Sequence, residues 1–215
     1  MNKTNLGWAE YNWNPVTGCT FGCPYYYARK SAYNLRGKYG YPLNDPFRPT
    51  FHPEHLHEPE KLKHGARIFA VGMGDIFDPL VEPEWVSQVF EEMRKCPQHT
   101  FLVLTKRAER LKEFDFPNNC MAGVSVDRQS RVGWIDLLRD CKAKMKCVNF
   151  EPLLKPVDPN FEGIDKAIVG ALHNEDGSYM PLKKEWVRTI IKEARRANCA
   201  IFIDDSARAH RHPIG

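Results

Sequence analysis

A regular alternation of short apolar runs and helical segments constrains the fold of this 215-residue chain more than any other feature. The apolar runs lie at residues 67–71, 100–104, 120–124, 147–150, 167–169 and 200–203. Segments with helical character lie at residues 25–35, 83–95, 108–114, 128–142 and 183–197. Fully apolar strands that alternate with helices are typical of a parallel sheet with both faces covered.

With a further strand expected before Cys19, this alternation gives about six to seven parallel strands. We therefore predict an α/β fold, built as a partial or closed (β/α) barrel of the TIM type. An open doubly wound sheet is the alternative, because the pattern alone does not distinguish an open sheet from a closed one.

Length and composition indicate one domain that spans residues 1–215 and is located in the cytoplasm. No apolar stretch approaches the roughly 18 residues that a membrane helix needs, so no membrane partner is expected. Seven cysteines without a disulfide framework argue against a secreted scaffold. A net charge of +4 permits a nucleic-acid partner without requiring one.

A short run near the amino terminus, NPVTGCTFGCPYYYARK, carries the strongest chemical signal. Closely spaced thiolates on an irregular loop can turn toward one iron-sulfur cluster, which a regular helix or strand does not allow. Cys19 and Cys23 lie on such a loop, and Gly18 and Gly22 let it turn. The spacing predicts a metal site at Cys19 and Cys23.

This loop resembles the cluster loop of the radical S-adenosylmethionine (radical SAM) superfamily, C-x-x-x-C-x-aromatic-C. Tyr25 matches the aromatic position, and Tyr26 occupies the position of the third cysteine ligand. Six segments, in this order, further resemble a phage-associated protein family of unknown function, the gene-product thirty-seven and sixty-eight type. They are NWNPVTGC, VGMGDIFDP, FLVLTKRAERL, AGVSVD, NFEPLL and IVGA.

The resemblance implies a radical SAM-like barrel that carries a 4Fe-4S cluster and S-adenosylmethionine. Such an enzyme cleaves S-adenosylmethionine to a 5'-deoxyadenosyl radical, which abstracts hydrogen from a substrate, here unknown, and takes electrons from a donor such as flavodoxin or ferredoxin. Tyr26 in place of a cluster cysteine is expected to impair this activity. Cys19 and Cys23 would bind the cluster. The expected cofactor-binding residues are Tyr25, Gly72, Gly74, Asp75, Ser125, Asp127 and Glu151.

Several of these polar residues also follow predicted strands directly, which favours one shared polar cavity at the carboxyl ends of the strands. Helix capping is the structural alternative for Asp75, Ser125 and Asp127 taken singly.

The alternative function is a catalytically inactive barrel that binds nucleic acid or protein. Basic and aromatic residues interleave along residues 25–36, as in surfaces that stack bases and contact phosphates. His52, His55 and His57 have a spacing that can bind a metal, although histidines of this kind are usually solvated. The chain ends at HRHPIG soon after its last predicted strand, from which we expect a truncated carboxyl terminus.

Overall fold

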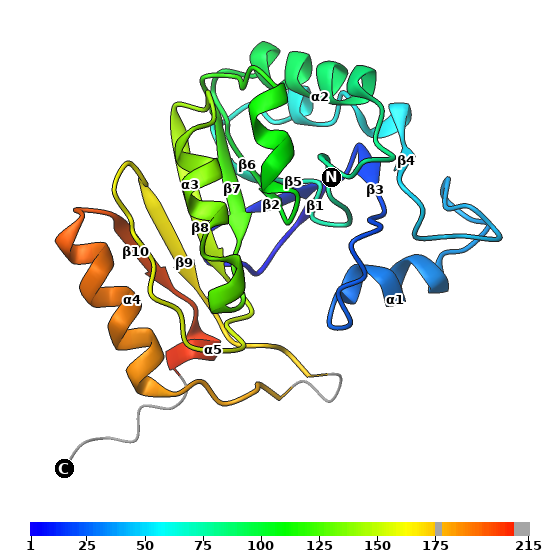
Figure 1. The fold of residues 1–215 in the computed structure, drawn as a ribbon. Helices are drawn as coiled ribbons and strands as arrows, with labels where there is room; N and C mark the ends of the chain where they lie inside the picture. The colour runs from blue at the N-terminus through cyan, green and yellow to red at the C-terminus, as the bar shows by residue number, and fades with distance from the viewer. Residues whose placement is uncertain (175–177, 209–215) are drawn as a thin grey trace. The chain divides into compact units, whose positions relative to one another are not determined.

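The computed structural model describes residues 1–174 and 178–208. The terminal HRHPIG sequence, and with it the expectation of truncation, lies outside these residues. The described strands form an eight-stranded sheet in the order β1-β2-β5-β6-β7-β8-β9-β10 and a two-stranded sheet of β3 and β4 (Figure 1). Among the described helices, none is long and apolar enough to cross a membrane.

The large sheet is mostly parallel, which confirms the predicted α/β class. Parallel pairs join β2 to β5, β5 to β6, β8 to β9 and β9 to β10. Within the described part of the chain, β1 and β10 end the sheet without pairing to each other, so the prediction of a closed barrel is wrong. A TIM barrel closes with eight parallel strands, whereas here the short β1 pairs antiparallel with β2 and covers that edge.

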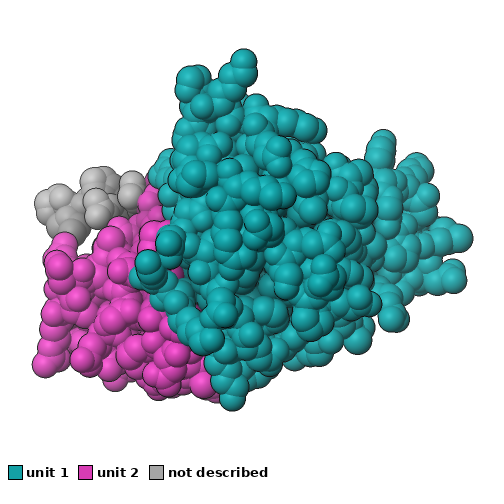
Figure 2. Space-filling view, turned by 90° about the horizontal axis from the view of Figure 1, so that it is seen from above, with its two compact units in different colours: residues 1–122, 142–144 teal, residues 123–141, 145–215 magenta. Residues whose placement is uncertain are grey.

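The chain divides into two compact units, coloured separately in Figure 2. Unit 1 comprises residues 1–122 and 142–144, and unit 2 comprises residues 123–141 and 145–215. The expectation of a single domain over residues 1–215 stays a prediction, and each unit is described by itself below.

Unit 1 is built around the parallel strands β2, β5 and β6. Its elements are β1 (Asn2–Lys3), β2 (Tyr11–Trp13), β3 (Val16–Thr17), α1 (Tyr27–Asn34), β4 (Thr50–Phe51), η1 (Pro53–His55), η2 (Pro59–Lys61), β5 (Arg67–Ala70), α2 (Pro83–Lys95), β6 (Thr100–Thr105), η3 (Ala108–Glu113) and the start of β7 (Cys120–Ser125). Helix α2 begins at Pro83, whose fixed φ suits a first helical turn, and buries Val86, Val89 and Met93 on one face. The ring nitrogen of the buried Trp13 donates to the His55 carbonyl at 2.8 Å.

Unit 2 is built around β8, β9 and β10. Its elements are η4 (Gln129–Arg131), α3 (Trp134–Arg139), β8 (Met145–Phe150), β9 (Lys166–Val169), α4 (Lys184–Arg196), β10 (Ala200–Ile203) and α5 (Asp205–Arg208). The rings of Phe150 and Phe161 pack edge to face at 5.9 Å, and α4 buries Ile190 and Ala194. These apolar strands match the runs that the sequence predicted.

Three predicted segments differ from the structure. The helix expected at 128–142 is instead η4 and the short α3, separated around Gly133, because glycine favours the helix weakly. Residues 108–114 form a 3-10 segment rather than an α-helix. The segment of the histidines expected to be solvated contains the strand β4 and buries Phe47 and His52.

Candidate functional site

The cysteine loop, residues 18–26, is fastened to the GMGD loop, residues 72–75, by backbone contacts. The Gly18 N–H donates to the Met73 carbonyl at 2.9 Å, and the Asp75 N–H donates to the Gly18 carbonyl at 3.2 Å. Gly18 has a φ of +90°, and a Cβ there would lie 2.4 Å from the Arg48 carbonyl oxygen. Only glycine fits this position, and the pairing holds the cysteine loop beside the carboxyl end of β5.

Both cysteines of the loop are buried and neither forms a disulfide. The Phe21 N–H donates to the Cys19 sulfur at 3.4 Å. Burial raises the pKa of the Cys19 thiol to about 12, and the nearby charges of Asp75 and Cys23 act in the same direction. Without a bound cation, Cys19 is therefore a protonated thiol at neutral pH.

Tyr26, in the position of the third cluster ligand, reaches the GMGD loop with its hydroxyl group. The Tyr26 hydroxyl lies 2.8 Å from the Gly74 carbonyl oxygen and 3.1 Å from that of Gly72. The Tyr27 hydroxyl donates to the same Gly72 carbonyl at 3.1 Å. The Tyr26 ring packs near Cys19 and edge to face on Phe47, and burial raises the pKa of its phenol.

This arrangement does not fit a 4Fe-4S cluster of the radical SAM type. Such a cluster needs three thiolates from the loop, and a phenol is a poor substitute for the soft sulfur ligand. Here Cys19 and Cys23 offer two thiols, while the Tyr26 hydroxyl is engaged by backbone carbonyls. The resemblance assigns the carbonyls of Gly72 and Gly74 to S-adenosylmethionine, but these carbonyls already accept hydrogen bonds from tyrosine hydroxyl groups. We therefore derive no radical step for this chain.

The Asp75 carboxylate joins the ends of β5 and β6. It accepts hydrogen bonds from the Thr105 hydroxyl at 2.8 Å, from the Lys106 N–H at 3.0 Å and from the Phe77 N–H at 3.0 Å. Burial raises the pKa of Asp75, while these hydrogen bonds oppose that shift. These hydrogen bonds connect the loop after β5 with the end of β6. A cofactor-binding role for Asp75 stays a prediction.

Asp78 is a residue of this site that the sequence analysis missed. Its carboxylate accepts from both the backbone N–H and the hydroxyl of Thr20 at 2.7 Å, which ties it to the cysteine loop. Arg107 donates to the Thr20 hydroxyl at 3.1 Å and lies over the Phe21 ring at 4.9 Å. Asp78 belongs to the VGMGDIFDP segment, yet no local pattern shows that its partner lies 58 residues away.

In unit 2, Ser125 is buried at the end of β7 and Asp127 is buried just after it. The Asp127 carboxylate pairs with Arg128 at 3.0 Å and with Arg131 at 2.7 Å. These ion pairs give Asp127 a structural role beside η4, and its predicted cofactor contact remains untested.

Glu151 follows β8 and belongs to a group of side chains in unit 2 that are close enough together to hold a metal ion. The ligating atoms of Glu151, His173 and Asp204 all lie within 4.8 Å of one another. Gly170 must be small here, because its Cβ would lie 2.7 Å from the Glu151 side chain. The structure thus brings Glu151 together with two residues that follow the neighbouring strands β9 and β10.

One protein-family model matches most of the sequence. The model for a protein of unknown function (DUF5131) matches residues 3–210. The chain belongs to DUF5131. No curated protein and no solved structure matches it. In this DUF5131 chain the matched range includes the cysteine loop, the GMGD loop and all the residues predicted to bind a cofactor.

The DUF5131 chain also presents an aromatic and basic surface on and after α1, the α1 surface, which consists of Tyr27, Arg29, Lys30, Tyr33, Arg36, Lys38 and Tyr39. All of these side chains are exposed, and the tyrosines are exposed by 57%, 49% and 76% in chain order. Ala28 and Ala32 form the buried face of α1, so the polar and aromatic face is left to solvent.

The histidines that the sequence suggested as a metal site do not converge on one point. The buried His52 lies 2.8 Å from the Thr17 hydroxyl, and His55 lies 3.0 Å from Glu58. The His52 and His55 rings lie 5.9 Å apart, and Glu54 lies within 4.0 Å of both, whereas His57 contacts a carboxylate of α2. Among the described residues, the three histidines are therefore not one of the groups whose ligating atoms come close enough to hold a metal ion.

Proposed function

We propose that this DUF5131 protein binds single-stranded nucleic acid through the α1 surface, and that its cysteine loop serves as a scaffold rather than as a cluster site. One observation carries the proposal. Residues 11–44 contain no Asp or Glu, hold Arg29, Lys30, Arg36 and Lys38, and include seven of the eight tyrosines of the chain. The positive charge of this stretch, +4, equals the net charge of the whole protein.

The chemistry of the surface suits a single strand better than a duplex. Exposed aromatic rings stack on unpaired bases, and Lys and Arg side chains contact phosphates at the same time. Tyr33 and Tyr39 offer exposed rings, and Arg29, Lys30 and Arg36 are exposed around them. A solvated helix face is the ordinary alternative, but such faces usually mix both signs of charge, and α1 has no acidic residue.

Fluorescence anisotropy with a labelled single strand, titrated with the whole protein at several salt concentrations, tests the proposal. Tyr33→Ala and Tyr39→Ala should each weaken binding by about 1–3 kcal/mol, or roughly 5- to 150-fold, if a base stacks there. Arg29→Ala should lower the salt slope by roughly 0.7.

Matched controls come from unit 2. Tyr179→Ala removes an exposed tyrosine, and Lys192→Ala removes an exposed cation of α4; neither should change affinity. An absence of binding at low salt would reject the proposal, as would equal losses in the α1 variants and the unit 2 controls.

The second candidate is a radical SAM-type protein whose activity is impaired in this chain by Tyr26. It is favoured by the backbone pairing of the cysteine loop with the GMGD loop, which puts the buried Cys19 and Cys23 beside a strand end. Since Tyr26 does not fit a cluster, the variant Tyr26→Cys should bind iron after anaerobic reconstitution with iron and sulfide, and the natural chain should not. The absorbance of the thiolate-to-iron bands measures iron binding by both proteins. A Tyr26→Cys protein that also binds no iron would remove this candidate.

Two further parts of the resemblance remain proposals with it, a partial (β/α) barrel of the radical SAM type and a phage setting. The cytoplasmic location expected from the composition also remains a proposal. The succession of parallel strands supports the first, and a phage setting would suit a nucleic-acid partner.

A further inference from the structure

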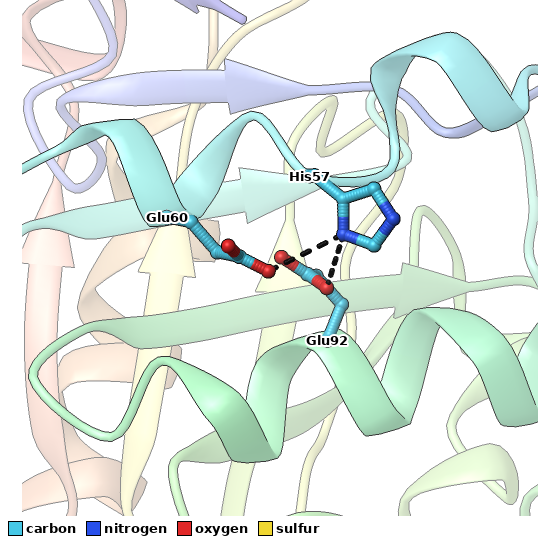
Figure 3. A group of neighbouring side chains, drawn as sticks. All are labelled: His57, Glu60 and Glu92. Carbon is cyan, nitrogen blue, oxygen red and sulfur yellow. Dashed lines mark hydrogen bonds and ion pairs between the residues drawn. The ribbon is translucent and has the colours of Figure 1, made fainter.

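Three ligating side chains meet in unit 1 away from the cysteine loop. His57 and Glu60 come from the segment around η2, and Glu92 comes from α2 (Figure 3). The His57 Nδ1 lies 3.3 Å from a Glu60 carboxylate oxygen and 2.9 Å from a Glu92 carboxylate oxygen. The ligating atoms all lie within 4.8 Å of one another.

Glu92 is the unusual member of this group, because its side chain is only 1% exposed. Its Oε1 is buried and has no hydrogen-bond partner among the described residues, although a buried carboxylate oxygen without a partner is costly. Its Oε2 contacts His57 and lies 3.9 Å from the Lys95 ammonium. Burial raises the pKa of Glu92, the adjacent Glu60 carboxylate raises it further, and His57 opposes both.

A simple ion pair does not account for the whole group. An imidazolium could pair with Glu92, but it would leave Oε1 without a partner and would leave the Glu60 and Glu92 carboxylates side by side. A cation with more than one charge would satisfy both carboxylates.

We propose that His57, Glu60 and Glu92 bind one first-row divalent metal ion of the zinc class. One imidazole nitrogen and two carboxylates are ligands that such ions accept, and two ligands about 2.0–2.2 Å from one tetrahedral ion lie roughly 3.3–3.6 Å apart. The His57–Glu60 separation of 3.3 Å already has that spacing, and the His57–Glu92 pair, at a hydrogen-bond distance of 2.9 Å, would open slightly around the ion. His57 and Glu60 are exposed, so the ion can enter from solvent and keep water as a further ligand. The site joins η2 to α2.

Cobalt(II) is the probe of choice, because its absorption spectrum separates ligation by nitrogen and oxygen from ligation by cysteine. The whole protein is titrated with cobalt(II) and then challenged with zinc(II). The test variants are His57→Ala and Glu60→Gln, whose side chains are exposed. Because His57 contacts the buried Glu92, the melting temperature of each metal-free variant is measured first to show that it folds. Matched controls are His64→Ala, an exposed histidine nearby, and Glu91→Gln, the exposed neighbour of Glu92 on α2.

The natural chain and both controls should bind cobalt(II) at this group without a thiolate-to-cobalt band, and each test variant should bind it there at least about tenfold more weakly, whereas any ion at Glu151, His173 and Asp204 should be unaffected. Zinc at about 100 times its dissociation constant should raise the melting temperature of the natural chain by about 5–10 °C, and that of the test variants by less. Equal affinity in His57→Ala, a thiolate band at the bound ion, or no binding at millimolar metal would each overturn the proposal.

Discussion

The Tyr26 hydroxyl offers a sharp test of how the cysteine loop is held, through the pair of variants Tyr26→Phe and Tyr27→Phe. Each change removes one oxygen and keeps the ring. The Tyr26 hydroxyl lies 2.8 Å from the Gly74 carbonyl and 3.1 Å from that of Gly72, whereas the Tyr27 hydroxyl donates to Gly72 at 3.1 Å. Tyr26→Phe therefore removes the donor described for Gly74, whereas Tyr27→Phe leaves Gly72 with the Tyr26 hydroxyl.

The hydrogen bonds that each variant loses set the expected decrease in the free energy of unfolding. In Tyr26→Phe the Gly72 carbonyl keeps the Tyr27 hydroxyl, but the Gly74 carbonyl loses the side-chain donor described for it. An unsatisfied buried acceptor costs about 1–3 kcal/mol. In Tyr27→Phe the Gly72 carbonyl can still share the Tyr26 proton, and the Tyr27 ring is 57% exposed, so we expect less than about 0.5 kcal/mol.

Urea denaturation measures these differences, with thermal melting as a second readout. A protein of this length should lose about 2–4 °C in melting temperature per kcal/mol, so Tyr26→Phe should melt roughly 2–12 °C lower and Tyr27→Phe no more than about 2 °C lower. Equal losses in the two variants, or a larger loss in Tyr27→Phe, would refute the assignment of the Gly74 contact to Tyr26.

Three further predictions concern the same site. The Cys19 thiol, with a pKa of about 12 against an ordinary value of 9.0, should react with a disulfide reagent at pH 8 at least roughly 100-fold more slowly in the folded than in the unfolded protein, judged against Cys19→Ser. Because its folded pKa is the higher one, its stabilising contribution is present below pH 9 and is lost as pH rises toward 12. Asp75→Asn should lower the free energy of unfolding by about 1–3 kcal/mol, since an amide nitrogen would then face the donors of Thr105 and the backbone; an unchanged urea midpoint would contradict this. Gly18→Ala should cost more than Gly22→Ala, because both have positive φ but only Gly18 would clash, at 2.4 Å; equal melting temperatures would contradict it.

Strands β5 to β10 were predictable because each contains a short apolar run, whereas the two-residue strands β1, β3 and β4 contain no such run and were not predicted. Helix α2 was predicted with its observed bounds, since Pro83 marks its start and apolar residues recur at helical spacing. The prediction of one helix at residues 128–142 was wrong, because hydrophobic periodicity does not reveal the break at Gly133. Whether the sheet closes depends on pairing between strands distant in sequence, which local periodicity does not encode.

The candidate site was harder to predict from the sequence than the strands were. The cysteine loop and the GMGD loop stand out as motifs, but the contact of Asp78 with Thr20 spans 58 residues and that of Glu92 with His57 spans 35. Glu92 in particular resembles any other glutamate in a helix with charged neighbours. Only the fold shows that its carboxylate is buried beside a second one.

The anchoring of Tyr26 on the Gly74 carbonyl also bears on how this lineage can change. Tyrosine and cysteine codons differ by a single base, so a chain with three loop cysteines lies one point mutation away in genetic terms. That mutation would forfeit the phenol's hydrogen bond to Gly74, at a cost of about 1–3 kcal/mol unless a bound ligand compensates. The loop backbone, fixed by the Gly18 pairing, would need no change. The barrier to a cysteine at position 26 is thus one of folding stability rather than of mutational distance.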